Sequence, residues 1–252
     1  MVDKSKVSDA EWEVRVDLAA AFRMGQAEWG DDLLFEHMTA RSPDDATQVL
    51  MNNPTELFTD ITASSLHLIN PDGTEAYDPD VRTHAFSYPM HKSVYDAIPE
   101  AACVIHAHSF NTIAVSMQKQ GLIRNNQWAI WIGEVVNHDY EGFLTGPKEA
   151  EKLVKCFKQS QVTLLRGHGM IVWGHSVREA YFLAYMLNRA CAVQIASGVG
   201  DGAIPPYLID QDIIDKAAAE AKGTWSDATP FSKGPWMALK AKARRDHPGF
   251  DT

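Results

Sequence analysis

The sequence has few cysteines, no long apolar run and no excess of basic residues. Its three cysteines, Cys103, Cys156 and Cys191, lie far apart, and no Cys-x-x-Cys pair occurs. This spacing argues against a disulfide framework or a cysteine zinc site, and it predicts reduced, buried thiols in a cytoplasmic protein. No apolar stretch approaches the roughly 20 residues that cross a bilayer, and the charged N-terminus does not resemble a signal peptide.

Basic charge is also scarce relative to acidic charge. The 252 residues include 33 Asp and Glu but 23 Lys and Arg, which gives a formal net charge of −10. Nucleic acids and anionic membranes favour basic surfaces, so neither is an expected partner. The hydrophobic share of 45% is typical of a globular protein. The length suits one domain over residues 1–252, with a C-terminal tail at 199–252.

Periodicity and turn residues predict alternating groups of strands and helices. We expect helices at 9–29, 91–98, 111–119, 147–159, 176–198 and 236–246. Strands are expected at 33–41, 47–52, 64–70, 102–108 and twice within 162–174, and residues 127–142 have β character. Ser8 and Ser176 are the expected N-caps of two helices. Strands and helices in this order predict an α/β fold, with a mixed sheet covered by helices on both sides.

Three histidines form the most informative pattern. Residues 104–109 read VIHAHS, and alternate residues of a strand share a face, so His106 and His108 should project together. His168 lies in RGHG, where the glycines allow a sharp turn. Imidazoles are common ligands of zinc, although two histidines on a strand are often only exposed residues. The residues alone therefore leave a metal site and a coincidence equally open.

Longer motifs indicate a family. VIHAHS and LLRGHGMIVWGHSVREAYFLAYMLNRAC, together with ITASSLHLIN, PMHKSVYDAIPEAAC and NHDYEG, resemble the class II aldolase/adducin family over most of residues 9–198. The resemblance implies an αβα sandwich with a mixed, largely antiparallel central sheet, often in a ring-like homotetramer. It also implies a divalent cation, zinc or else manganese or iron, on His106, His108 and His168. Such a cation would stabilise the enediolate left when a C–C bond of a small substrate breaks.

One residue of the aldolase pattern is missing. Aldolases of the family carry a proton-transferring glutamate four residues ahead of the histidine that is His91 here, and this chain has Ser87 in its place. No carboxylate occurs at all between residues 81 and 92. A serine hydroxyl is not a base near neutral pH without an activator. His91 and Tyr140 are therefore the candidate catalytic residues, with packing or surface roles as the alternative.

The phosphate-binding positions of the sugar-phosphate members are changed too. They correspond here to Glu36–His37, Ser64–Ser65 and Ala85–Phe86. Bulky side chains fit a phosphate dianion less well than backbone amides and small hydroxyls do, so a small hydroxy or oxo acid becomes the expected substrate. Arg166 could bind the carboxylate of that acid, or an acidic neighbour instead. The candidate substrate-binding residues are Ser64, Ser65, Ser87 and Arg166.

Three functional hypotheses follow from these motifs. The first is a metal-dependent lyase, aldolase-like or decarboxylating, that cleaves a C–C bond in a small non-phosphorylated acid. The second is a non-haem iron oxygenase, because three ligands with open positions also suit iron(II) and dioxygen. The third is a non-catalytic adducin-like module, and epimerases and dehydratases also occur in the family. The expected partners are a small-molecule substrate and further copies of the chain, with the tail at 199–252 near a subunit boundary.

Overall fold

One sheet organises the fold in the computed structural model, which describes residues 1–30, 32–33, 35–78, 83, 87–142, 147–199, 207–222, 224 and 230–252. Within these ranges seven strands form the sheet in the order β3-β2-β1-β4-β7-β6-β5. Neighbouring strands are antiparallel, except for the parallel pair β5 and β6. The strands are β1 His37–Arg41, β2 Val49–Met51, β3 His67–Ile69, β4 Cys103–Ala107, β5 Val135–His138, β6 Val162–Leu165 and β7 Gly169–Gly174.

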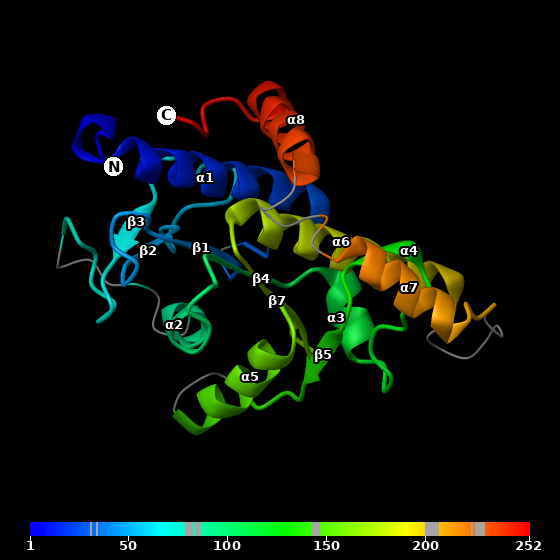
Figure 1. Ribbon diagram of the computed structural model, residues 1–252. Coiled ribbons are helices and arrows are strands. Elements are labelled where there is room, and N and C mark those ends of the chain that lie inside the picture. The colour runs from blue at the N-terminus through cyan, green and yellow to red at the C-terminus, as the bar shows by residue number, and fades with distance from the viewer. Residues whose placement is uncertain are drawn as a thin grey trace.

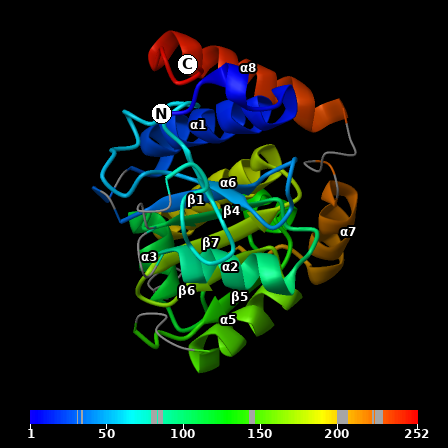
Figure 2. The same cartoon turned by 90° about the vertical axis from the view of Figure 1, so that its left-hand side faces the viewer.

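Helices cover both faces of this sheet, as Figures 1 and 2 show. The longer helices α1 (Asp9–Trp29) and α6 (Val177–Ser197) lie on one face, with α8 (Pro230–Asp246) outside them. Helices α2 (Ser87–Ala97) and α5 (Pro147–Gln159) cover the other face. The remaining helices are α3 (Phe110–Ser116), α4 (Gln127–Trp131) and α7 (Gln211–Ala221). Among the described residues no helix is both long enough and apolar enough to cross a membrane.

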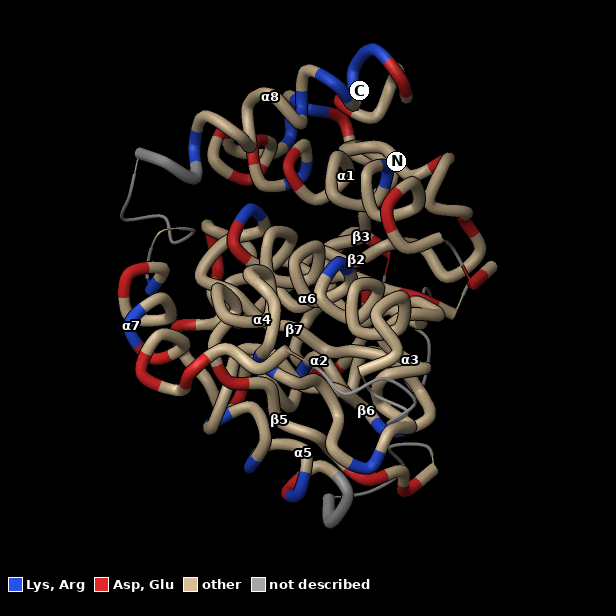
Figure 3. The backbone as a smooth tube through the Cα atoms, turned by 90° about the vertical axis from the view of Figure 1, so that its right-hand side faces the viewer, with Lys and Arg blue, Asp and Glu red and all other residues tan. Residues whose placement is uncertain are grey.

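Alternation along β4 determines where the predicted histidines emerge. Cys103, Ile105 and Ala107 are fully buried in the core beneath α1 and α6. Val104 belongs to the second core, beneath α2 and α5, and His106 shares its face because side chains alternate along a strand. Strands β4, β6 and β7 contain no Asp, Glu, Lys or Arg, and Figure 3 places the charged positions mainly on outer helices and loops.

The predicted α/β sandwich is confirmed, and so are the three longest helices expected from the sequence. Ser8 and Ser176 cap helices as expected, since their Oγ atoms accept N–H bonds from Glu11 at 3.0 Å and from Glu179 at 3.1 Å. The β interpretation of 127–142 was wrong for its first part, which forms α4. Asn126 caps that helix by accepting the N–H of Ala129. The aromatic residues of the segment favoured a strand in the sequence interpretation, and this capping signal was overlooked.

Other boundaries also differ from the expected ones. Strand β1 begins at His37 rather than at residue 33, and α2 begins four residues before His91. Helix α7 was not predicted, because most of its residues are exposed and its apolar pattern is short. Helix α8 extends the predicted segment 236–246 toward the N-terminus, to Pro230.

The C-terminal residues pack against their own chain. The buried Trp236 lies 5.6 Å from the ring of Tyr181 and 6.3 Å from that of Phe182, measured between ring centroids. The carbonyl of the buried Phe250 accepts the N–H of Ala63 at 2.8 Å. Residues 200–206, 223 and 225–229 of the tail lie outside the described ranges. A subunit contact by the tail remains a prediction, as does the homotetramer.

A buried cation connects α1 to the loop that precedes β3. Arg15 is fully buried, and its Nε donates to Oε1 of Glu11 at 2.8 Å. Its Nη1 donates to the carbonyls of Leu66 at 2.7 Å and Ala63 at 3.3 Å. A buried charge is tolerated only when it is paired, so removing one partner is more costly than replacing both with apolar residues.

We therefore expect Arg15→Ala to lower the free energy of unfolding by about 3–5 kcal/mol, because Glu11 then remains buried without its cation. The double variant Glu11→Leu/Arg15→Met should recover most of this loss. Urea denaturation of the parent and the two variants measures both effects. An Arg15→Ala protein within about 1 kcal/mol of the parent would contradict this interpretation of the pair.

Candidate metal centre

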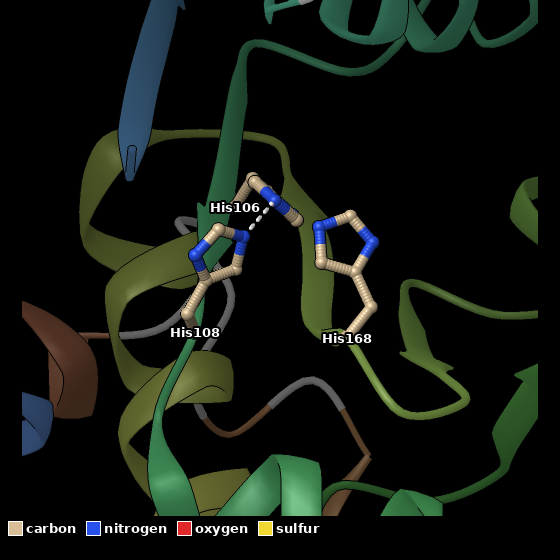
Figure 4. A group of neighbouring side chains, drawn as sticks. All are labelled: His106, His108 and His168. Carbon is tan, nitrogen blue, oxygen red and sulfur yellow. Dashed lines mark hydrogen bonds between the residues drawn. The ribbon is translucent and has the colours of Figure 1, made fainter. Parts of the chain in front are cut away.

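The structure brings the three predicted histidines together at one end of β4 and β7 (Figure 4). His106 is on β4, His108 lies one residue beyond its end, and His168 lies in the turn between β6 and β7. Their ring centroids are 4.8 to 4.9 Å apart. One nitrogen of each ring lies within 4.8 Å of the nitrogens of the other two. The rings therefore converge on a single point, as the ligands of one cation do.

Hydrogen-bond partners fix which nitrogen carries the proton in two of these rings. Nδ1 of His106 lies 2.9 Å from the carbonyl oxygen of Met170, and Nδ1 of His108 lies 2.8 Å from Oδ2 of Asp32. Both oxygens only accept, so both Nδ1 atoms are the donors. In the neutral rings Nε2 is then unprotonated, and the two Nε2 atoms face each other 2.9 Å apart.

Two nitrogen donors so placed can bind one cation together. Burial lowers the pKa of His106 well below its ordinary value and that of His168 to about 4, which favours the neutral form of these two rings. A divalent cation suits the arrangement, since it accepts several neutral nitrogen donors at once. Outer partners such as the Met170 carbonyl and the Asp32 carboxylate are typical of ligating histidines. The donor set therefore fits the metal that the sequence predicts.

A glycine allows the β6–β7 turn to approach β4. Gly169 has a φ of +154°, and a Cβ atom there would lie 2.3 Å from the carbonyl oxygen of Ala107. Any larger residue would push the turn away from β4, and His168 would move with it. Gly167 also has a positive φ, of +66°, but a Cβ atom added there would meet no neighbouring heavy atom within 4 Å. The two glycines flanking His168 thus differ in the space around them.

A second group of buried polar side chains lies behind His106. His37 pairs with His106 across β1 and β4, and their ring centroids are 4.8 Å apart. Nδ1 of His37 lies 2.6 Å from Nε2 of His91, and Nδ1 of His91 lies 2.6 Å from the hydroxyl of Thr39. That hydroxyl is 2.8 Å from the hydroxyl of Tyr95.

This network engages both ring nitrogens of His91. The ring is fully buried, and burial lowers its pKa well below the ordinary value, so it is neutral. Among the described residues, the hydrogen bond of His91 toward the cluster goes to His37, and His106 acts on His91 through its charge. A direct contact between His91 and a substrate has no support from this geometry, and its catalytic role stays a prediction.

A small pocket borders the histidine cluster at His168. Its apolar wall consists of Met90, Leu153 and Leu165, and its polar wall consists of His138, Asp139, Tyr140, Glu141, Gly142 and Arg166. The cavity volume is about 40 Å³, room for about three water molecules. The exposed ring of Tyr140 lies 6.5 Å from that of His168, between centroids. Tyr140, a predicted catalytic residue, is thus close to the cluster.

Arg166 lines the same pocket, but its guanidinium already has partners. Nη1 donates at 3.0 Å to the carbonyls of Ser116 and Gln118, and Nη2 donates to that of Lys119 at 3.2 Å. Nε lies 3.2 Å from Oδ1 of Asp139. Of the two roles considered for Arg166, the acidic neighbour is the one present here, and the arginine also holds the end of α3.

The predicted serines are not gathered at the cluster. Ser64 and Ser65 line a different pocket, together with Met1, Asp3, His67 and Tyr77 among others. The Oγ atom of Ser65 donates to the carbonyl of Thr62. Ser87 is buried at the first residue of α2. Ala85 and Phe86 lie outside the described residues. Substrate binding by the serines remains a prediction that this arrangement does not favour.

Two carboxylates near His108 were not singled out as site residues from the sequence. Asp32 accepts from the ring of His108, and Oε1 of the buried Glu36 accepts the backbone N–H of His108 at 2.6 Å. Glu36 was considered only as a bulky replacement in a phosphate loop, and Asp32 was not considered. Separations of 72 and 76 residues along the chain leave no local spacing that could reveal either contact.

The structure thus combines an αβα sandwich with three histidines gathered at one end of its sheet. The family described as Class II Aldolase and Adducin N-terminal domain matches residues 16–195. The chain belongs to the class II aldolase and adducin family.

Relatives agree with this membership. A Pseudomonas aeruginosa protein whose name places it among the class 2 aldolases is 32% identical over 250 residues, which cover 98% of this chain and 95% of that protein. The crystal structure of an aldolase II superfamily protein from Pseudomonas syringae has a TM-score of 0.91 and 33% identity, and covers 99% of both chains. Rat alpha-adducin is 30% identical over 224 residues, or 88% of this chain but 30% of adducin.

Substitution of the two glycines tests how closely the turn must approach β4. Gly169→Ala should reduce zinc affinity at least tenfold, because the clash with the Ala107 carbonyl displaces His168 from the other ligands. Gly167→Ala is the matched control, with a cost of about 1–2 kcal/mol in stability for its left-handed backbone and little effect on zinc. Competition against a chromophoric chelator measures the affinities. Equal zinc affinities in the two variants would contradict the proposed role of Gly169.

The metal-free protein should lose stability as the pH falls from about 6.5 toward 4. Burial lowers the pKa of His168 from 6.5 to about 4, so in this range the unfolded chain binds a proton that the folded chain does not. The contribution of His168 to the free energy of unfolding therefore decreases with falling pH and levels off below its folded pKa. His168→Gln should flatten this dependence. Urea denaturation with chelator present, at pH 7.5 and pH 4.5, tests this, and equal slopes for parent and variant would contradict it.

Proposed function

We propose that this chain is a metal-dependent lyase that cleaves a C–C bond in a small, non-phosphorylated hydroxy or oxo acid. The observation that carries the proposal is the convergence of His106, His108 and His168, in which the Nε2 atoms of His106 and His108 lie 2.9 Å apart beside the third ring. Neutral ligands leave a bound dication with its full charge. Such a cation, when bound, supplies Lewis-acid stabilisation of negative charge that develops on a substrate oxygen. Zinc is the expected metal, with manganese or iron as alternatives.

The pocket beside His168 supports a small substrate without phosphate. Arg166 is the cationic side chain among the described residues that line it, and its guanidinium is committed to three carbonyls and to Asp139. A phosphate dianion would meet two carboxylates among the described lining residues, Asp139 and Glu141, and their negative charges would oppose it. An acid whose carboxylate binds at the cation therefore suits the site, and the limited volume suits a short substituent.

Tyr140 is the side chain that we assign to proton transfer in this pocket. Its ring lies against His168, and its hydroxyl can both donate and accept a hydrogen bond. Met90, Leu153 and Leu165 are buried and line the same pocket, so part of its surface is apolar. His91 is held in its network with Thr39 and His37, which suits a role in orienting His37 behind His106 better than contact with the substrate.

Two alternatives remain in view because specific observations favour each. Three nitrogen ligands and an adjacent pocket also suit iron(II) and dioxygen, so an oxygenase is the second candidate. The similarity to alpha-adducin over most of this chain favours a non-catalytic module as the third. The identity of the bound metal, oxygen consumption and turnover distinguish the three, since a lyase needs a metal but no oxygen.

The test combines metal analysis with turnover of a panel of short 2-hydroxy and 2-oxo acids and their phosphorylated counterparts. We expect one divalent cation per chain, release of an aldehyde or carbon dioxide from a non-phosphorylated acid, and a loss of activity of at least a hundredfold on chelation. His108→Ala should lose both metal and activity, whereas His67→Ala, on β3 and outside the cluster, should keep both. Full activity in the presence of chelator would reject the lyase, and turnover that requires oxygen would favour the oxygenase.

A further inference from the structure

His108 is held at two points by one short loop. The residue lies just beyond the end of β4, so its backbone N–H has left the ladder of the sheet. Oε1 of Glu36 accepts this N–H at 2.6 Å, and Oδ2 of Asp32 accepts the ring Nδ1–H at 2.8 Å. Both carboxylates belong to the segment between α1 and β1, four residues apart. One loop therefore sets both the backbone position and the ring orientation of this histidine.

The contact with Asp32 also determines the chemical form of the ring. A neutral imidazole carries its proton on either nitrogen, and in water both forms are populated. A carboxylate beside Nδ1 favours the form with the proton on Nδ1, which leaves the Nε2 lone pair free. That lone pair points at Nε2 of His106. Without Asp32, His108 would spend part of its time with the proton on Nε2, in a form that cannot bind a cation through that atom.

Charge balance at the cluster leads to the same residue. Histidine ligands in their neutral form add no negative charge to compensate a dication, and position 87, where the family resemblance implies a glutamate, holds a serine. Asp32 and Glu36 are the carboxylates that contact His108 in the part of the chain that the structure describes. Half of the Asp32 side chain is exposed, so solvent screens its charge. Its hydrogen bond should therefore matter more than its electrostatic attraction.

We propose that Asp32 is a positioning residue for the metal site: it holds His108 in the Nδ1-protonated form and provides negative charge that the missing glutamate no longer supplies. The inference rests on the proposed function only in requiring that a divalent cation binds to the three histidines. Glu36 supports Asp32 by fixing the backbone of His108. Asp32 acts through His108, so neither a direct bond to the metal nor contact with a substrate is needed.

Two substitutions separate the hydrogen bond from the charge. Asp32→Asn removes the charge, but its amide oxygen can still accept from Nδ1, whereas Asp32→Ala removes both. Zinc affinity, measured by competition with a chromophoric chelator, should fall by about 10–100-fold in Asp32→Ala. It should fall clearly less in Asp32→Asn. Asp96→Asn is the matched control, because Asp96 is a half-exposed carboxylate on α2 that pairs with Lys92, and its affinity should equal that of the parent.

The second measurement does not depend on metal. Nitrogen-15 NMR of the metal-free protein at pH 7.5 reads the tautomer of His108, which should be Nδ1-protonated in the parent and in Asp32→Asn. In Asp32→Ala the signals should move toward a mixture of both tautomers. A zinc affinity of Asp32→Ala within twofold of the parent, or an unchanged tautomer, would overturn the role of Asp32 and leave the lyase proposal standing. A parent protein that binds no zinc would instead overturn the proposed function itself.

Discussion

The opposed Nε2 atoms of His106 and His108 are the constraint on which the site depends. Their separation of 2.9 Å lets both atoms bind one cation, and burial lowers the pKa of His106, which favours the neutral ring that such a cation needs. The fold maintains this geometry from several sides. The Met170 carbonyl holds one ring, Asp32 holds the other, and Gly169 lets the turn bring His168 against the end of β4. The hydrophobic cores on both faces of the sheet hold the backbones of β4 and β7 in place, and the histidines are attached to the ends of these strands.

The surroundings of the cluster are the basis for proposing a substrate other than a sugar phosphate on the family's fold. The pocket at His168 is lined by apolar side chains and by Arg166, whose guanidinium already donates to backbone carbonyls. Tyr140 contributes a hydroxyl to this pocket, and its ring lies near that of His168. The carboxylates of Asp32 and Glu36 contact His108, and Ser87 is buried at the start of α2. Family members with and without catalysis share one sandwich, so these side chains, and not the fold, decide what the chain does.

Local patterns predicted much of the fold and the heart of the site. Period-2 alternation and two flanking glycines drew attention to the three histidines, the family resemblance then implied them as ligands, and capping serines located two long helices. Contacts between segments that are distant in the sequence could not be predicted from such local patterns. The contact of Asp32 with His108 spans 76 residues, and the buried pairing of His91 with His37 spans 54. Helix α4 was misread because its aromatic residues favour strands in isolation, whereas packing on α6 and the Asn126 cap decide its conformation.

X-ray absorption of the zinc-loaded protein tests the central claim most directly, because it reports the atoms bound to the metal. Three imidazole nitrogens on one ion require nitrogen or oxygen neighbours at about 2.0–2.1 Å, with outer scattering that fits three imidazole rings. This account predicts that result at one zinc per chain. A spectrum that fits sulfur ligands, or one without imidazole scattering, would contradict it.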